Sequence, residues 1–474
     1  MNIFVTGATG FIGRALALRL RRDGHEVVAY VRDKKRAASQ LGMEVSFLET
    51  STGGEALSKA MAKADAVVNL AGHPLLGGRW SDEKIAAIKS SRLDLTRNLV
   101  AAMSPESAPK VFVSGSAVGL YGDGSDTIIT EESPSGTDFL ATLCRDWESE
   151  ALKAREKGVR VVRLRTGVVL GRGDGALEQM LPAFKMGVGG PIGSGDQYVP
   201  WIHIEDLVEM IVESIHNEEM SGAFNGTAPN PVTFADLASA LGSQLGRPSF
   251  LPLPSIAVKV LFGDAAVVLL QGQRAIPAHA EKLGFTFQFE TIQQALKDIL
   301  DNESIEVTSI KGDLPDSDYV RKRTPAFMLE TSTVIERPLE EVFSFFSRPE
   351  NLGVITPPAM KFRITNLPET MEDGALIDYR LKVGPVPIRW QTRIENWVPG
   401  KMFADSQLKG PYHSWWHEHS FEAKGDQTLM TDRVYYAPPA GIIGRAVNSL
   451  FIADQLKQVF GYRSSILRLR FGKK

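Results

Sequence analysis

Cysteine is almost absent from this sequence: Cys144 is the only one among 474 residues. A single thiol excludes an internal disulfide and a cysteine-rich metal site, and it is typical of a protein kept in a reducing compartment. The formal net charge of -3 excludes the strongly basic surface that a nucleic-acid partner would require. Long apolar runs are also missing, since the apolar stretch 258–270 is too short for a membrane span and contains Asp264. We therefore predict a cytoplasmic protein whose partner is a small molecule.

Glycines mark the first turn of the chain. A short β-type run over residues 2–6 is followed by GATGFIG, by an amphipathic helical run and by a second strand, EVVAYV. This order predicts a strand–helix–strand unit. Glycine suits its first turn because the turn is tight, because the backbone must approach a pyrophosphate, and because the following helix directs unpaired N–H groups at the anion. The predicted dinucleotide-binding residues here are Gly7, Thr9, Gly10, Phe11, Ile12 and Gly13.

Positive charge follows the second strand. Arg32 is the first charged residue after this strand, and Asp33, Lys34, Lys35 and Arg36 come next. NAD enzymes usually end this strand with a carboxylate for the ribose hydroxyls, whereas a guanidinium can bind a 2′-phosphate. We therefore predict that Arg32 and Asp33 contact the cofactor, and that NADP is preferred over NAD and NADPH over NADH. The alternatives are NAD binding through Asp33 and a merely solvated start of the next helix.

Two further strands are predicted to end at the same edge of the sheet. The run ADAVVNLAG, residues 64–72, ends in small side chains, which let a ligand lie across that edge. The run VFVSGSAVGLYG, residues 111–122, brings Ser116 there as a candidate catalytic hydroxyl. The predicted cofactor contacts of this region are Leu70, Ala71, Gly72 and Arg79, with a surface-loop position as the alternative for Arg79.

These motifs resemble the extended short-chain dehydrogenase/reductase superfamily. The glycine turn TGATGFIG, the strand ends NLAG and SGSAVGLYG, and the later segment WIHIEDL carry this likeness. Together with LCRDWESEA, RTGVVLG and NGTAPNPV they are similar to an epimerase-like subgroup, also described as nucleoside-diphosphate-sugar epimerase-like and in part labelled "cell division inhibitor". The resemblance spans residues 1–298 and implies an α/β fold: an NADP-binding Rossmann domain with a doubly wound parallel sheet, and a small C-terminal subdomain.

The Tyr and Lys that this superfamily usually places four residues apart on the next helix are missing. There the Tyr is the general acid/base, and the Lys lowers its pKa and holds the nicotinamide ribose. A glutamate of the family pattern can be aligned with either Glu148 or Glu150 in LCRDWESEA. The Tyr and Lys positions then fall on Leu140 and Cys144, or on Thr142 and Asp146. The usual mechanism is therefore not available in its usual form.

Three replacements for the missing pair are conceivable, and each has a structural alternative. Tyr121 lies near Ser116 in sequence and is a candidate catalytic residue, but in the superfamily this tyrosine usually helps shape the site. Cys144 could act as a weak acid, or it could be a small buried hydrophobic residue. The acidic residues of the same helix could act instead, although their spacing is that of a solvated helical face. They are Asp146, Glu148 and Glu150.

A polar, irregular stretch at residues 302–324 separates this unit from a second one. After it come a strand, a helix, a series of strand-like runs and a long amphipathic C-terminal segment. The phrases ERPLEEVFSFFSRPENL, WWHEHSFEA, DRVYYAPPAG and LKQVFGYRSSIL resemble the START-like and polyketide-cyclase helix-grip superfamily, which implies an α+β domain with a cavity for an apolar ligand. The predicted domains are 1–240, the Rossmann domain; 241–300, its small C-terminal region; 301–324, a linker; and 325–474, the helix-grip domain.

Histidines gather in the segment YHSWWHEH. On a strand, His413, Trp415, His417 and His419 would share one face, and three imidazoles can bind zinc. Trp415 lies among them, however, and Glu418 points the other way, so we expect no carboxylate or cysteine on that face. We therefore predict no metal site.

The cofactor is better defined than the reaction. Hydride transfer needs little from protein side chains because the cofactor carries the chemistry. We predict an NADP(H)-dependent oxidoreductase acting on a small, unknown substrate, which the second domain would hold or deliver if that substrate is apolar. The alternatives are a regulatory protein or sensor that binds NADP(H) without turnover, and a nucleotide-sugar epimerase.

Overall fold

The chain forms two compact units. The structure is a computed structural model that describes residues 1–384, 386–439 and 448–472. Contacts within the chain group residues 1–34 and 44–300 into the first unit, and residues 35–43 and 301–474 into the second. Within the described residues, no helix combines the length and the apolar character needed to cross a membrane.

A seven-stranded parallel sheet forms the centre of the first unit. Its strand order is β11-β7-β5-β4-β1-β2-β3, and every neighbouring pair is parallel. The strands are β1 (Asn2–Thr6), β2 (Glu26–Val31), β3 (Ser46–Glu49), β4 (Ala66–Asn69), β5 (Val111–Ala117), β7 (Arg160–Thr166) and β11 (Gly222–Gly226). The carboxyl ends of β1, β4 and β5 share one edge, as the sequence predicted.

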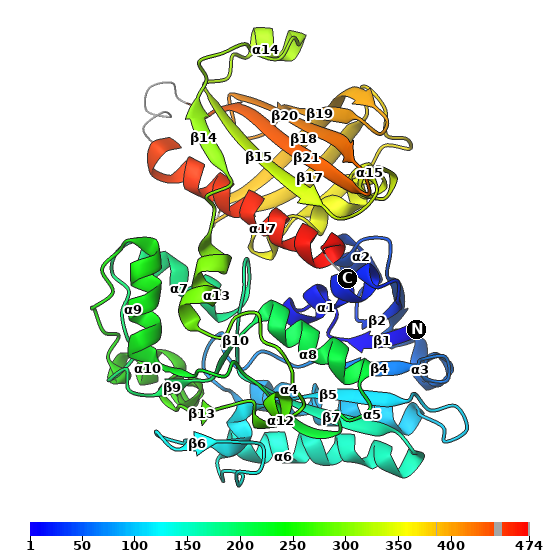
Figure 1. Cartoon of the computed structure of the whole chain (residues 1–474), viewed down its shortest axis with the longest axis vertical. Helices are drawn as coiled ribbons and strands as arrows, with labels where there is room; N and C mark the ends of the chain where they lie inside the picture. Colours follow the sequence, from blue (N-terminus) through cyan, green and yellow to red (C-terminus); the bar gives the residue numbers. More distant parts are fainter. Residues whose placement is uncertain (385, 440–447, 473–474) are drawn as a thin grey trace. The chain divides into compact units, whose positions relative to one another are not determined.

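Helices cover both faces of this sheet (Figure 1). The main helices of this unit are α1 (Phe11–Arg22), α3 (Gly53–Met61), α4 (Asp82–Ser90), α5 (Leu93–Ala102), α6 (Phe139–Leu152), α7 (Gly175–Lys185), α8 (Ile204–His216), α9 (Phe234–Leu245), α10 (Ser255–Phe262) and α13 (Ile292–Leu300). Helix α2 (Lys34–Leu41) lies almost entirely in the residues grouped with the second unit. Helix α1 packs beside α8, and α5 packs beside α6. Phe4, Val67 and Phe112 lie on three neighbouring strands and are at most 1% exposed, because a parallel sheet is covered on both sides.

Short two-stranded pairs complete the first unit. They involve β6 (Ile128–Ile129), β8 (Val168–Leu170), β9 (Tyr198–Val199), β10 (Trp201–His203), β12 (Val232–Thr233) and β13 (Arg274–Ala275). Helix α6 begins where the Asp138 carboxylate accepts a hydrogen bond from the Ala141 N–H at 2.8 Å, a usual N-terminal cap. This cap fixes the start of the helix on which the superfamily places its Tyr and Lys.

The second unit is an antiparallel sheet with a long C-terminal helix. Its eight strands follow the order β14-β15-β21-β20-β19-β18-β17-β16. They are β14 (Glu306–Ser309), β15 (Phe327–Ile335), β16 (Arg363–Asn366), β17 (Leu376–Val383), β18 (Val386–Val398), β19 (Met402–Lys409), β20 (Ser414–Lys424) and β21 (Gln427–Ala437), with helices α14 (Asp318–Lys322), α15 (Leu339–Phe346) and α17 (Ala453–Phe471). Leu456 and Phe460 of α17 pack in one core with Trp390, Trp415 and Tyr436 of the sheet. The predicted fold class, α/β with a separate antiparallel domain, is confirmed.

Residues 301–324, the predicted linker, include a short strand and a short helix and are grouped with the second unit. Ile305 is 2% exposed and packs with Val307 in the core of the second unit, and the strand that follows pairs with β15. Tyr319 and Val320 of α14 pack against Trp416. These few apolar residues are enough to hold the segment to the second unit, whereas its many charged residues face solvent.

Candidate functional site

The glycine turn between β1 and α1 has room only for glycine at two positions. Gly7 has a φ of +69°, and a Cβ built on it would lie 2.7 Å from the carbonyl carbon of Leu70. A Cβ on Gly13 would collide with the backbone carbonyl oxygen of Gly7. The turn therefore brings backbone atoms of two strands and a helix closer together than any other residue type allows.

A cavity of about 290 Å³ lies over this turn. One wall is the N-terminus of α1, whose first residues, Phe11 to Arg14, carry no negative charge and whose N–H groups precede the helical hydrogen-bond ladder. This is the environment that binds a pyrophosphate. The cavity is lined by Gly7, Gly10, Phe11, Ile12, Gly13, Leu70, Val168, Val169, Gly175 and Ala176. Six of the predicted cofactor residues are thus together, and the turn fits a dinucleotide.

The other predicted cofactor residues lie outside the lining of this cavity. Arg32 and Asp33 are exposed at the end of β2, and Thr9 is half-buried within the turn. The backbone N–H of Ala71 donates to the hydroxyl of Thr6, with 3.2 Å between the atoms. This hydrogen bond to a buried residue of β1 holds Ala71 at the sheet edge.

Two arginines, Arg79 and Arg92, lie near the carboxyl end of β4, and the sequence did not indicate their contacts. Arg79 donates to the carbonyl oxygen of Val260 in α10 at 2.6 Å, so its guanidinium is directed at that helix. Arg92 lies against Gly72, since a Cβ built there would be 2.9 Å from the guanidinium carbon. Burial lowers the pKa of Arg92, whose guanidinium stacks on Trp147. Arg92 is therefore the cation at this strand end.

Ser116 is held by a buried carboxylate. Its hydroxyl donates to Oε1 of Glu148 at 2.8 Å, and Nε of Arg165 donates to the same oxygen at 2.8 Å. The second oxygen of Glu148 accepts from Arg163 at 2.9 Å. Burial alone would raise the pKa of Glu148, but the hydrogen bond and charge of Arg165 outweigh it and lower that pKa. Glu148 is consequently an ion-paired carboxylate.

Tyr121 belongs to the same network through Arg165. Its hydroxyl accepts from the Arg165 guanidinium at 2.8 Å and donates to Oδ1 of Asn225 at 2.7 Å. Burial raises the pKa of Tyr121 to about 12. The phenol is therefore neutral near pH 7, and its proton is already used in a hydrogen bond.

The prediction of a solvated acidic face on α6 is wrong for Glu148, which is 5% exposed. Asp146 is exposed as predicted, and Glu150 pairs with Arg97 at 3.0 Å near the surface. The missed signal is the strand RVVRLRT, in which Arg163 and Arg165 require a carboxylate partner next to a buried sheet. Among the other helix positions, Leu140 and Cys144 are buried, and burial raises the pKa of Cys144 to about 12. That thiol is a small core residue.

Sequence comparison places the first unit among known proteins. A profile of the NAD dependent epimerase/dehydratase family matches residues 3–225, and a domain of unknown function, DUF1731, matches residues 253–299. The chain is 46% identical over 304 residues to the epimerase family protein SDR39U1 homolog, chloroplastic, of Arabidopsis thaliana, covering 63% of this chain and 87% of that protein. It is 38% identical to the human epimerase family protein SDR39U1, covering 63% of this chain and 100% of that protein.

Solved structures agree with these matches. The crystal structure of human SDR39U1 (isoform 2) with NADPH is 37% identical, with a TM-score of 0.57, and the match covers 63% of this chain and 99% of that one. UDP-N-acetylglucosamine 4-epimerase from Bacillus cereus has a TM-score of 0.51 over 63% of this chain and 98% of its own. At 19% identity, the second likeness shows a common fold only.

Proposed function

Because the chain belongs to the NAD-dependent epimerase/dehydratase family, among the SDR39U1-type epimerase family proteins, we propose that its first unit binds NADP(H) and acts as an oxidoreductase on a small organic substrate. The observation that carries the proposal is the cavity over the glycine turn, where Gly7 and Gly13 leave no room for a Cβ. The human relative solved with NADPH supports the choice of cofactor.

The preference for NADP over NAD rests on Arg32. It stands exposed at the end of β2, where this fold binds the adenosine ribose, and its guanidinium can pair with a 2′-phosphate. Asp33 is its neighbour and would repel that phosphate, so the two side chains have opposite effects on the choice of cofactor. The positive charge of Lys34 favours the phosphorylated form.

The bound nicotinamide would supply or accept a hydride, and the residues of the chain would order the substrate beside it. Ser116 and Tyr121 hold their protons in hydrogen bonds to Glu148 and Asn225, so neither hydroxyl is free to donate one. The proton of the reaction would then come from solvent. This favours acceptors that need no side-chain acid, such as an enone, a quinone or a flavin.

A second candidate function has a specific observation in its favour. In one of the two alignments, the positions of the missing Tyr and Lys fall on Leu140 and Cys144, which are both buried. The hydroxyl protons of Ser116 and Tyr121 are also engaged in hydrogen bonds. A regulatory protein or sensor that binds NADP(H) without turnover would have the same buried positions and the same engaged hydroxyl groups. The nucleotide-sugar epimerase alternative has less support, because the epimerase solved from Bacillus cereus shares only the fold.

For the second unit we propose a START-like helix-grip domain over residues 325–474. The antiparallel sheet and the long helix α17, which packs against it, support this assignment. An apolar ligand would bind between them after side-chain rearrangement, because a cavity that the described residues of this unit form measures only about 50 Å³.

A fluorescence titration followed by an activity assay on the same sample can test the function of the first unit. The full-length protein would be titrated with NADPH, NADP and NADH, and acceptors would then be added while NADPH fluorescence is followed. Steady oxidation by one acceptor would establish the reductase. Tight binding without turnover would favour the regulatory protein, and absence of NADPH binding would overturn both.

A further inference from the structure

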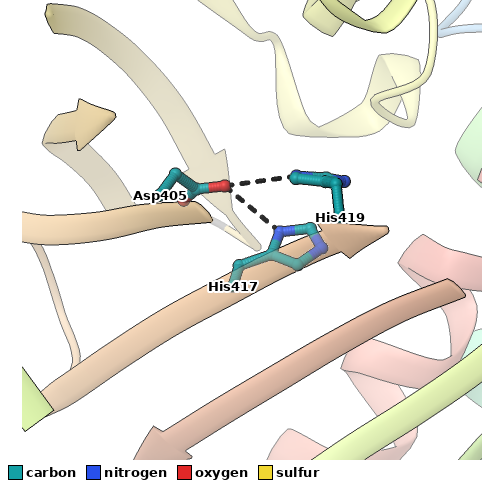
Figure 2. A group of neighbouring side chains, drawn as sticks. All are labelled: Asp405, His417 and His419. Atoms are coloured by element: carbon teal, nitrogen blue, oxygen red, sulfur yellow. Dashed lines mark hydrogen bonds and ion pairs between the residues drawn. The ribbon is translucent and has the colours of Figure 1, made fainter. Parts of the chain in front are cut away.

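Two histidines of the second unit lie buried between two aspartates. His417 and His419 are on β20, with Asp405 on the neighbouring strand β19 and Asp432 on β21. The register pairs Asp405 with His417 and Asp432 with His419. The expectation that no carboxylate joins this histidine face is therefore wrong, because the carboxylates come from adjacent strands. Figure 2 shows the Asp405 side of this arrangement.

Each imidazole presents one nitrogen to each aspartate. Towards Asp432, His417 Nε2 lies 2.9 Å from Oδ1, and His419 Nδ1 lies 2.8 Å from the same oxygen but is poorly aligned for a hydrogen bond. Towards Asp405, His417 Nδ1 lies 3.3 Å and His419 Nε2 lies 3.4 Å from Oδ2. Arg463 pairs with Asp432 at 3.1 Å.

The contacts of the two imidazoles with Asp432 are thus shorter than their contacts with Asp405. Charge-assisted hydrogen bonds between N–H and carboxylate are about 2.7–2.9 Å long. The contact of His417 with Asp432 matches this in length and alignment, and the contact of His419 matches it in length only. The contacts to Asp405 are longer. If each nitrogen that faces Asp405 carries a lone pair in place of a proton, that lone pair is directed at the Asp405 carboxylate. Two lone pairs and a carboxylate oxygen then converge on one point.

Two of the spacings in this cluster are those of a metal site. Ligand atoms about 2.05 Å from a tetrahedral ion are about 3.3 Å from one another. The ligand atoms of Asp405, His417 and His419 all lie within 4.8 Å of one another, and the carboxylate contacts are 3.3 and 3.4 Å. Histidine ligands usually donate their other N–H to a carboxylate, as Asp432 is placed to accept here. Its negative charge is balanced by Arg463.

We propose that Asp405, His417 and His419 bind a divalent transition-metal ion, with Zn²⁺ as the best fit and Fe²⁺ as the other ion that two imidazoles and one carboxylate suit. Asp432 accepts the hydrogen bond that orients the His417 imidazole and is a positioning residue. Three protein ligands leave one coordination position open, which is the arrangement of metal sites that act on a bound water or substrate.

A small cavity with both apolar and polar lining borders the proposed site. Asp405 and His419 line it together with side chains that include Phe346, Ile377 and Phe403. Its volume is about 50 Å³, and a water occupies about 30 Å³, so it has room for one or two waters. The competing interpretation is a cluster without metal, in which a protonated imidazole is held between the two carboxylates.

Metal content of the full-length protein decides between them. The protein would be purified from zinc-supplemented medium and analysed by mass spectrometry for metals, then stripped with a chelator and titrated with Co²⁺. We expect one ion per chain and a visible Co²⁺ spectrum of tetrahedral type. His417→Ala should lose both, whereas the matched control His413→Ala, at an exposed histidine outside β20, should keep both.

Asp432→Asn should weaken metal affinity by about 10–100-fold and keep the ion at saturation. Circular dichroism would check each variant. Should His417→Ala fail to fold, the wild-type protein still decides: absence of stoichiometric Zn²⁺, Fe²⁺ and Co²⁺ binding overturns the proposal. Metal binding that survives in a folded His417→Ala protein overturns it equally.

Discussion

Ser116 donates its hydroxyl proton to the carboxylate of Glu148, 2.8 Å away in the interior of the first unit. This bond links the strand that carries the family's serine to the helix from which its Tyr and Lys are missing. The same carboxylate forms ion pairs with Arg163 and Arg165. In this protein the region of the usual proton donors is therefore an ion-paired network, and its integrity is open to direct measurement.

Replacing Glu148 should destabilise the first unit strongly. Glu148→Gln leaves two arginines without their buried partner, and breaking one side of a buried ion pair costs about 3–5 kcal/mol. Urea unfolding, followed by hydrogen exchange of peptides from α6, would measure the loss in free energy of unfolding. The control is Asp146→Asn on the same helix, where an exposed change should stay within about 0.5 kcal/mol. Equal effects of the two variants would contradict the network.

Adding one methyl group at Gly13 should impair cofactor binding. Its Cβ would collide with the Gly7 carbonyl, so the turn or the start of α1 must move away from the phosphate position. We expect Gly13→Ala to weaken NADPH binding by at least about tenfold, or about 1.4 kcal/mol, in a fluorescence titration. Gly54→Ala in α3 is the matched control, because a Cβ there meets open space. Unchanged affinity in Gly13→Ala would place the dinucleotide elsewhere.

Arg32 should distinguish the two cofactors. Arg32→Ala removes one charge-assisted contact to a 2′-phosphate, worth about 1.5–3 kcal/mol, and should weaken NADPH binding by about 10–100-fold while leaving NADH binding almost unchanged. Titrations of both cofactors at one ionic strength would show this. Lys63→Ala, at another exposed cation of the first unit, serves as control. Parallel losses for NADPH and NADH would exclude a role for Arg32 in selectivity.

The thiol of Cys144 should be almost inert in the native protein. With a pKa of about 12 in the fold against an ordinary value near 8.5, its thiolate fraction at pH 8 is lower by about 10³-fold. Labelling by a thiol reagent at pH 8 should be slow in buffer and rapid in urea, and the native rate should rise with pH as the thiolate forms. Fast labelling of the native protein at pH 8 would show an accessible, acidic thiol instead.

Local patterns predicted the glycine turn correctly, because the need for glycine arises within a few residues of the chain. Gly7 and Gly13 meet each other and the end of β4, and the strand–helix–strand order already implied that meeting. Glu148 was misjudged for the opposite reason. Its environment is set by Arg163 and Arg165 on β7, whose position beside α6 depends on the order of strands in the sheet.

The histidine cluster also depends on contacts between strands, which local sequence patterns do not reveal. Alternation along β20 correctly put His417 and His419 on one face, and both are buried. Their partners Asp405 and Asp432 are 12 and 15 residues from His417 in sequence, and only the register of β19, β20 and β21 brings them opposite. A search of neighbouring predicted strands for inward-pointing carboxylates would have found them.

The strand β14 protects its neighbour from other chains. It pairs with residues Phe327 to Glu330 of β15 and so satisfies backbone groups that would otherwise line an open sheet edge. A chain shortened to begin at residue 325 would expose that edge, and an exposed edge strand is a template for intermolecular pairing. Loss of residues 301–324 is therefore expected to increase the aggregation of the second unit, because residues Phe327 to Glu330 of β15 lose their paired strand.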